Sequence, residues 1–457
     1  MPDGGLQARL RRLRRPGVAA PPADSLSRLE HSLLGASDDE VPLKERLQRL
    51  VEAASLRSAQ RRRAGLGERF RGREVVGDRG AFLLVEKDLP IGAATGTWDV
   101  PDVPARTRDW LEQLPAVPAE APAILTGDPA FEGFDFSRAA FLDTETTGLS
   151  GGTGTAAFLI GVGSVEGDRF QVRQYFMRDY NEEPALLEAL AADLARFDHL
   201  VTYNGRQFDV PLLETRYRLD RRRFPLGESL HLDLLHPARR LWKLRLESCR
   251  LQSLEQALLG ATRVGDVPGD EIPAIYFRYI RGRDSGSLGR VLQHNLVDVV
   301  SLAALAALAC HWVSGMEIED SRDCYSLARV LERAALHGRA EGQYRRALER
   351  DPGPLRAQAL IRLGDYAKRR GEFEAALGMW EEAAGGGECV AFRELAIHHE
   401  RRRRDPSAAL EIVARGLRRL EEQSEGCCRR TLRDFARRRR RLEAKLERLA
   451  PRPAGAL

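Results

Sequence analysis

Two carboxylates lie two residues apart near the centre of this 457-residue sequence. Asp143 and Glu145 end the apolar run AAFLDTET, which predicts a buried strand. Residues two apart on a strand point to the same face, so both carboxylates are expected to reach one spot, with Thr144 turned to the other face. Because unpaired charge is costly at the end of a buried strand, the pair favours a metal site over a solvated turn.

A glycine-rich stretch, GLSGGTGT at 148–155, follows the two acids and could cradle a phosphate. Such a cradle normally runs from a strand into a helix, whose N-terminal amides face the anion. Here the next run, AAFLIGVG, predicts a second strand, and no Lys-Ser/Thr pair follows the glycines. We interpret the stretch as a turn between two strands, with an actin-like ATP-binding loop as a minor alternative.

Two later motifs place further polar residues beside apolar elements. VTYNGRQFDVPLL puts Asn204 at a strand end and Asp209, next to Phe208, at the start of a helix, where an Asp can also serve as a cap. QHNLVDVVSLAAL puts His294 and Asp298 four residues apart, on one face of an otherwise apolar helix. Each position has an ordinary structural explanation, but four acids in this order do not share one.

With these motifs, residues from about 137 to 312 resemble the DnaQ-like (DEDD) 3′–5′ exonuclease domains of the ribonuclease H-like fold. The resemblance is to YprB-type proteins in particular, which can carry tetratricopeptide repeats. DTETTGL matches the first motif of that family, YNGRQFDVPLL the second and HNLVDVVSL the third. The family is expected to hydrolyse phosphodiester bonds from a 3′ end.

The resemblance implies four metal-binding carboxylates: Asp143, Glu145, Asp209 and Asp298. Converging carboxylates repel one another unless cations neutralise them, and hard oxygen ligands favour Mg²⁺ or Mn²⁺. Two such ions, about 3.5–4 Å apart, can clamp an in-line displacement at phosphorus. Asn204 and Phe208 would then seat the terminal nucleotide by a hydrogen bond and by stacking.

His294 departs from the family pattern. The two subclasses of the family have a His five residues before the last Asp or a Tyr four residues before it, whereas this chain has His294 four residues before Asp298. The resemblance implies that His294 orients the attacking water or takes its proton. The alternative, an ordinary helix histidine, stays open.

The order of elements predicts the fold class. Three strands in a meander, followed by alternating helices and strands, indicate a mixed α/β sheet of the ribonuclease H-like kind. We expect a basic region at 1–70 that is disordered or partly helical, and a small β-containing segment with a Pro-rich linker at 71–135. The exonuclease domain would occupy 136–315, and helical repeats 320–450.

The last third of the chain shows a repeating pattern. Tyr344, Trp380 and Val413 recur at steps close to the 34-residue period of tetratricopeptide repeats, each followed three positions later by a small residue. We expect these repeats to bind a protein partner. A plain helical bundle is the alternative, and the third copy is degenerate.

Other polar residues support weaker interpretations. Asp233 ends a strand near the expected cleft, where the family pattern suggests a supporting role, whereas His231 and His236 lack a third zinc ligand. A basic run could follow a phosphate backbone or form a solvated helix face: Arg239, Arg240, Lys243 and Arg245. The arginine runs at 401–404 and 437–441 are interpreted as exposed faces.

Composition narrows the class of protein. The chain is 43% hydrophobic and 30% charged, with six cysteines and no C-x-x-C pair, which favours a reduced, cytoplasmic protein without a disulfide framework or a membrane span. The leading hypothesis is a metal-dependent 3′–5′ exonuclease that acts on DNA or RNA. The alternatives are a non-catalytic nucleic-acid-binding adaptor and the ATP-binding protein.

Overall fold

The computed structural model describes residues 65–91, 103–148, 154–282, 286–422 and 429–449. Most of the predicted basic region at 1–70 and the centre of the glycine-rich turn lie outside these residues. The described end of the basic region forms a short helix, α4 (Leu66–Phe70).

A seven-stranded sheet forms the core of the first part of the chain, with the order β1-β2-β5-β4-β3-β6-β7. It combines antiparallel pairs with two parallel ones, which confirms the mixed α/β sheet. The strands are β1 (Gly72–Gly77), β2 (Gly80–Pro90), β3 (Ala139–Thr146), β4 (Ala157–Glu166), β5 (Arg169–Phe176), β6 (His199–Thr202) and β7 (Leu230–Asp233).

The neighbours of strand β3 determine what lies beside its carboxylates. On one side β4 runs antiparallel, with Asp143 opposite Gly161. The glycine-rich stretch therefore joins two antiparallel strands, as predicted. On the other side β6 runs parallel, with Phe141 opposite Val201. Because parallel strands end at the same edge of a sheet, the segment after β6 lies beside the end of β3.

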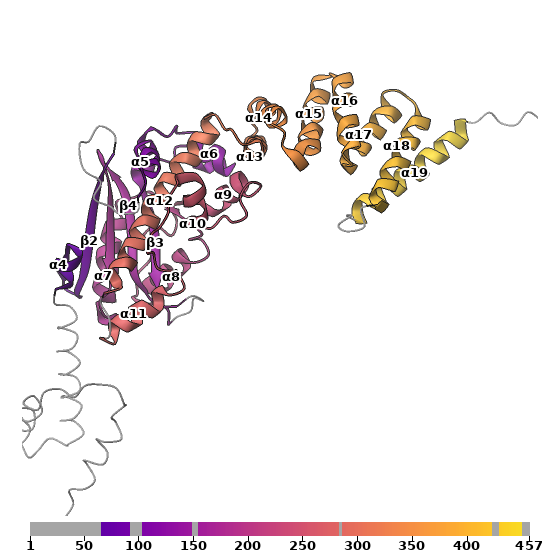
Figure 1. The fold of residues 1–457 in the computed structure, drawn as a ribbon. Helices are drawn as coiled ribbons and strands as arrows, with labels where there is room; N and C mark the ends of the chain where they lie inside the picture. Colours follow the sequence, from indigo (N-terminus) through magenta and orange to yellow (C-terminus); the bar gives the residue numbers. More distant parts are fainter. Residues whose placement is uncertain (1–64, 92–102, 149–153, 283–285, 423–428, 450–457) are drawn as a thin grey trace, which may run out of the picture. The chain divides into compact units, whose positions relative to one another are not determined.

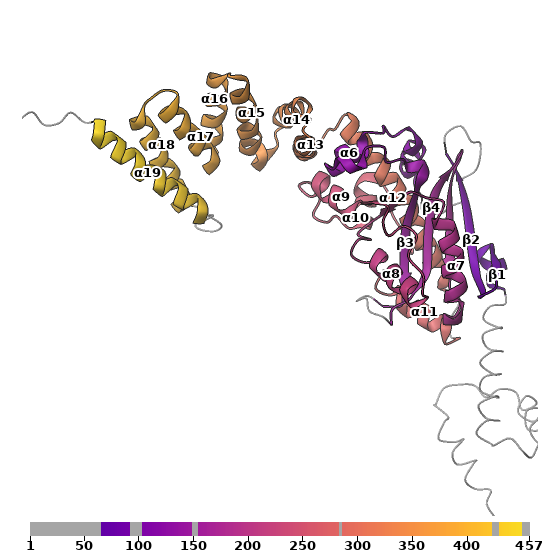
Figure 2. The ribbon, with the colours of Figure 1, turned by 180° about the vertical axis from the view of Figure 1, so that it is seen from behind.

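Alternation along β3 divides the hydrophobic core between the two faces of the sheet. Ala139 and Phe141 belong to one core, and Ala140 and Leu142 to the other. Figures 1 and 2 show the sheet from opposite sides, with α12 in front of it in the first view and α7 in the second. The helices of this part are α5 (Ala105–Glu112), α6 (Ala121–Thr126), α7 (Glu183–Leu194), α8 (Asp209–Leu219), α9 (Leu235–Trp242), α10 (Leu251–Leu254), α11 (Ile272–Ile280) and α12 (Leu288–Ser314).

Helix α12 is the central helix of the first core. It is long and apolar enough to cross a membrane by length and composition, but 89% of its most apolar window is buried inside the protein. It packs on strands β3, β4 and β5 and on helices α5 and α6. Its apolar character therefore has a structural reason, namely that it is covered on several sides.

Residues 71–135 differ from the expected small segment with a Pro-rich linker. The β1–β2 hairpin joins the main sheet through β5, with Leu84 opposite Tyr175. The Pro-rich stretch at 114–123 contains a 3₁₀ turn (Leu114–Ala116) and the start of α6, and Pro115 and Pro122 lie in the first turns of these elements, where no amide hydrogen bond is lost. Leu114, Ala121 and Leu125 are buried in the first core, so the linker prediction was wrong.

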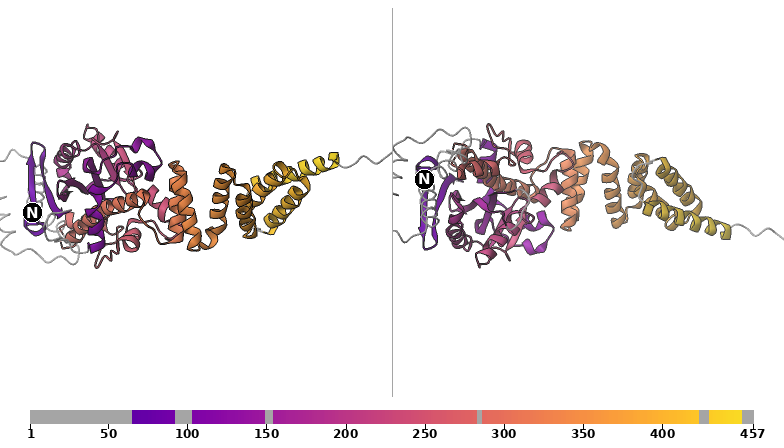
Figure 3. Two further views of the ribbon diagram at one scale, coloured as in Figure 1. Left: turned by 90° about the horizontal axis from the view of Figure 1, so that it is seen from above. Right: turned by 90° about the horizontal axis from the view of Figure 1, so that it is seen from below.

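A helical region follows the sheet (Figure 3), and each helix contacts the next. It comprises α13 (Ser321–Arg333), α14 (His337–Glu349), α15 (Arg356–Arg370), α16 (Phe373–Gly385), α17 (Cys389–Arg401), α18 (Pro406–Glu422) and α19 (Arg429–Leu449). Tyr344, Trp380 and Val413 lie in α14, α16 and α18, and all three are almost completely buried. The recurring positions therefore carry core residues of every second helix.

Candidate metal and nuclease site

The end of strand β3 presents side chains to both faces of the sheet. Asp143 and Glu145 point towards α12, since both residues interact with groups on that helix. Thr144 turns to the opposite face, as predicted, and donates a hydrogen bond to Oδ1 of Asp209 at the start of α8. Helices on opposite faces of the sheet thus bring their acids to one strand end.

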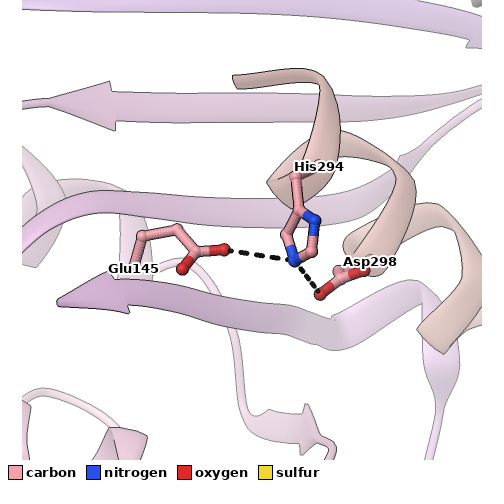
Figure 4. A group of neighbouring side chains, drawn as sticks. All are labelled: Glu145, His294 and Asp298. Carbon is pink, nitrogen blue, oxygen red and sulfur yellow. Dashed lines mark ion pairs between the residues drawn. The ribbon is translucent and has the colours of Figure 1, made fainter. Parts of the chain in front are cut away.

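Glu145, His294 and Asp298 form the tightest group (Figure 4). One ligand atom from each lies within 4.8 Å of the others. His294 Nε2 is 3.5 Å from Asp298 Oδ2 and 3.8 Å from Glu145 Oε1. His294 and Asp298 face the strand together because they are one helical turn apart. Among the described residues, this group includes neither Asp143 nor Asp209.

Asp143 is held by a residue that the sequence analysis did not single out. Asn295 donates from Nδ2 to Asp143 Oδ2 at 2.8 Å, and its Oδ1 accepts a hydrogen bond from Gln174 Nε2 at 2.9 Å. Asn295 is fully buried. It fits only because Gly161 lies beneath it: a Cβ on Gly161 would be 2.4 Å from Asn295 Oδ1. The glycine of β4 therefore sets how closely α12 approaches Asp143.

Burial and mutual repulsion disturb the titration of the three acids on or beside β3. Burial raises the pKa of Asp143 well above its usual range, and the charges of Asp298 and Asp209 raise it further. Burial and the charge of Asp143 do the same for Glu145. Burial also raises the pKa of Asp209 to about 6, although the hydrogen bond from Thr144 opposes it. Acids that are costly to ionise together are stabilised by a divalent cation, so these oxygen donors fit Mg²⁺ or Mn²⁺.

Arg263 supplies positive charge to the site from a loop that the sequence analysis passed over. Its guanidinium contacts Asp298 Oδ1 and lies 2.5 Å from Glu255 Oε1 and 3.1 Å from Asp266 Oδ2. Glu255 is 1% exposed. Burial alone would lower the pKa of Arg263, but the carboxylates outweigh it and raise that pKa. Arg263 therefore fixes one oxygen of Asp298 while the other faces His294.

Asp266 orients His294. Its Oδ1 lies 2.8 Å from His294 Nδ1, which leaves Nε2 to face Glu145 and Asp298. Burial lowers the pKa of His294, but Asp298, Asp266 and Glu145 outweigh this effect and raise it to about 9. Without a bound cation, His294 is therefore protonated at neutral pH and offsets part of the negative charge of the acids.

Asp233 organises the segment after β6. Its carboxylate accepts backbone hydrogen bonds from Asn204 at 2.7 Å, from Arg206 at 3.1 Å and from Leu235 at 3.1 Å. Asn204 adopts a left-handed conformation with φ of 65°, which Asn tolerates better than most residues. Phe208 is 57% exposed for so large an apolar side chain. Asn204 and Phe208, the two residues predicted to contact substrate, lie in the segment just before Asp209.

The remaining polar residues take ordinary roles. His231 Nε2 lies 2.7 Å from the hydroxyl of Thr202, and His236 is exposed. In the arginine runs, Arg403 pairs with Glu374 at 2.7 Å and Arg437 with Asp434 at 3.4 Å.

Comparison with known proteins finds a superfamily match over the part of the chain that carries these residues. Residues 140–310 match the model of the RNase_H superfamily, and all four predicted carboxylates lie within that range. Over 293 residues the chain is 32% identical to the Bacillus subtilis (strain 168) protein YprB. The aligned region spans 63% of this chain and 70% of YprB, so it extends beyond the superfamily match.

Proposed function

The chain belongs to the family of Bacillus subtilis YprB and contains an RNase H-like domain, and from this premise we propose that it is a metal-dependent 3′–5′ exonuclease. The superfamily supports a nuclease-type function; the direction of cleavage and the two-ion mechanism are our proposal. The observation that carries it is the convergence of desolvated acids from β3, α8 and α12 at one strand end, where burial makes their joint ionisation costly.

Four carboxylates would hold the cations: Asp143, Glu145, Asp209 and Asp298. Three have an oxygen fixed by a protein donor, from Asn295, Thr144 and Arg263, which orients them before a cation binds. When bound, Mg²⁺ or Mn²⁺ would polarise the phosphate and make water a better nucleophile.

The side chains of the domain itself would bind the strand end and move a proton. Phe208 would stack on the terminal base and Asn204 would hydrogen-bond to the terminal nucleotide. His294 Nε2, held by Asp266, would accept a proton from the attacking water once the negative charge around it is neutralised. Asp143 and Glu145 are only partly exposed, so contact with bulk water is reduced and the charge interactions between them are strengthened.

The helical region would recruit a partner. We propose that it forms tetratricopeptide-like repeats, because Tyr344, Trp380 and Val413 occupy the second helix of successive helix pairs. Such stacked pairs are a common surface for binding protein segments.

One observation favours a second candidate, a nucleic-acid-binding adaptor without catalysis. Arg263 already supplies a cation to Asp298, and His294 is charged beside Glu145. If these side chains already neutralise the carboxylates, the folded protein does not require a bound metal ion to offset their charge. The adaptor would bind nucleic acid without cutting it, and the exonuclease would cut it.

A time course on 3′-labelled and 5′-labelled single-stranded DNA and RNA separates the two candidates. Purified protein would be compared with an Asp143→Ala, Glu145→Ala double variant, in Mg²⁺, Mn²⁺ or EDTA. Metal-dependent shortening from the 3′ end, absent in the variant, supports the exonuclease and identifies the sugar. No cleavage of any substrate, with binding unchanged by the variant, rejects it in favour of the adaptor.

A further inference from the structure

A basic hollow of about 790 Å³ opens at the edge of the sheet where β6 ends. Tyr203 and Asn204, the two residues directly after β6, form part of the wall of this hollow. Since β6 runs parallel to β3 and next to it, this wall adjoins the end of β3 that carries Asp143 and Glu145. The other lining residues are Leu235, Arg239, Lys243, Glu247, Ser248, Cys249, Arg250 and Leu251.

Helix α9 divides its cations between scaffold and hollow. Arg240 donates to the carbonyl of Thr126 at 2.9 Å, and Arg245, just after the helix, pairs with Asp323 at 2.6 Å. Arg239 and Lys243, one helical turn apart, line the hollow instead and are exposed. Two residues of the basic run at 239–245 therefore bind other parts of the protein, and two face the hollow.

The lining of the hollow carries more cations than carboxylates. Within the part of the chain that the structure describes, Arg239, Lys243 and Arg250 form no ion pair. Glu247 also lines the hollow, so three cations face one carboxylate and the lining is net positive. Unpaired cations in a concave surface attract a polyanion, because the walls concentrate the field.

The wall of the hollow is built before any ligand arrives. The hydroxyl of Tyr203 donates to the carbonyl of Cys249, which ties the segment after β6 to the loop before α10. Asp233 fixes the backbone of Asn204 and Arg206. A preformed wall binds without a large ordering cost.

We infer that this hollow holds the sugar-phosphate backbone of a single nucleic-acid strand, whose 3′ end enters the carboxylate site. The inference rests on the proposed function and adds the strand's path: phosphates lie on Arg239, Lys243 and Arg250, and Asn204 stands between hollow and carboxylates. A volume of this size suits a few nucleotides of one strand and not a duplex. Contacts to phosphates read no sequence, so binding is sequence-independent.

A second hollow, of about 820 Å³, provides a matched control. It is lined by Arg218, Arg222 and Arg223, but also by Glu214 and Glu228. Its Arg222 pairs with Glu188 at 2.5 Å, so less free positive charge remains. It also lies at the far end of α8 from Asp209. Removing two exposed cations there changes the net charge equally without touching the inferred path.

The test measures binding apart from cutting. Fluorescence anisotropy of a labelled twelve-nucleotide oligothymidylate would be followed in EDTA over a series of salt concentrations. Arg239→Gln with Lys243→Gln should weaken binding at least tenfold and flatten the salt slope by about 1.4, since each lost single-strand phosphate contact removes about 0.7. Arg218→Gln with Arg223→Gln should leave affinity within twofold, and Arg239→Lys should retain most binding.

Unchanged thermal unfolding temperatures would show that both double variants fold. Equal weakening by the two double variants, or no binding by the unmodified protein, would overturn the inference. If the hollow behaves as stated but no substrate is ever cut, the exonuclease proposal fails and the strand path stands. If cutting occurs and the Arg239 and Lys243 variant binds and cuts like the original, the strand path alone fails.

Discussion

Asn295 of helix α12 donates a hydrogen bond to Asp143 of strand β3 at 2.8 Å, directly above the Cα of Gly161. The pairing fixes one oxygen of the acid and also fixes how closely helix and sheet approach. A change at Gly161 should therefore reach the site without altering any charged group.

Gly161→Ala tests this relationship. The new Cβ would lie 2.4 Å from Asn295 Oδ1 and 2.9 Å from Val299 Cγ2, so either the Asn295 side chain or α12 must move away from β4. We expect a loss of about 1–3 kcal/mol in unfolding free energy, together with at least a tenfold loss of metal-dependent cleavage. Urea unfolding and initial rates of cleavage measure the two effects.

Gly163→Ala is the matched control. It meets Val299 Cγ1 at 2.6 Å and Phe170 Cζ at 2.5 Å, but not Asn295. It should cost similar stability and leave the folded fraction largely active. Equal loss of activity in both variants would show that Asn295 does not transmit the effect.

Metal binding should raise the thermal unfolding temperature, because a ligand of the native state stabilises it by mass action. Asp143→Asn should abolish that rise, and without metal it should unfold at a higher temperature than the original protein, because a buried, repelled acid is gone. Glu86→Gln, on β2 and paired with Arg73, is the control that should keep the metal response. A metal response that survives Asp143→Asn would contradict the assigned site.

Affinity for Mn²⁺ should fall as pH falls, since protons compete for acids whose pKa is raised.

Arg263→Met should destabilise the domain by about 3–5 kcal/mol, because Glu255, Asp266 and Asp298 would lose their shared cation. Adding Glu255→Met should recover much of that loss, since it removes the most deeply buried of these acids. Urea unfolding of both variants gives the comparison. A double variant less stable than the single one would show that Glu255 does not depend on Arg263.

Asp266→Asn should lower the pKa of His294 from about 9 by about 1–2 units, because a charged partner at 2.8 Å becomes neutral. NMR titration of the imidazole, in the absence of metal, measures the shift. Asp270→Asn, four residues further on and exposed, should leave it unchanged. An unaltered titration in Asp266→Asn would mean that Asp298 and Glu145 alone set the charge of His294.

His231 should make the domain sensitive to mild acid. Burial and the charge of Arg206 lower its pKa to about 4 in the folded state, with Asp233 opposing them. The unfolded chain takes up this proton below about pH 6.5, so the stabilisation is complete above pH 6.5 and is lost as pH falls towards 4. Between pH 7 and 5 the loss is about 2 kcal/mol. His231→Gln should reduce the loss measured by urea unfolding, and His236→Gln should not.

Much of the candidate site could be proposed from sequence because its acids lie next to apolar residues in a strand and a helix. Asp143 and Glu145 end a buried strand, and Asp298 interrupts an apolar helix. The sequence pattern alone therefore indicates that these charges would be costly to bury without a partner. Local periodicity also gave the sheet strands and α12. The substrate roles of Asn204 and Phe208 stay predictions.

The rest depends on contacts between distant segments. Arg263 and Asp266 lie in a polar loop that looks solvated, and only folding brings them to α12. Asn295 carried a signal that could have been used, since it is a polar residue within an apolar helix face. The β1–β2 hairpin was visible from alternation, but its pairing with β5 is not encoded locally. The Pro-rich stretch was misjudged because proline suits the first turn of a helix as well as a linker.

Asp143 and Asn295 are 152 residues apart in the chain, and this separation has a consequence during synthesis. A ribosome that adds about 5–20 residues per second needs roughly 8–30 s to make the intervening stretch. Throughout that time the nascent chain holds Asp143 and Glu145 but has neither Asn295 nor Asp298. A polypeptide released before helix α12 is made therefore lacks both Asn295, which holds Asp143, and Asp298, the last of the four candidate carboxylates.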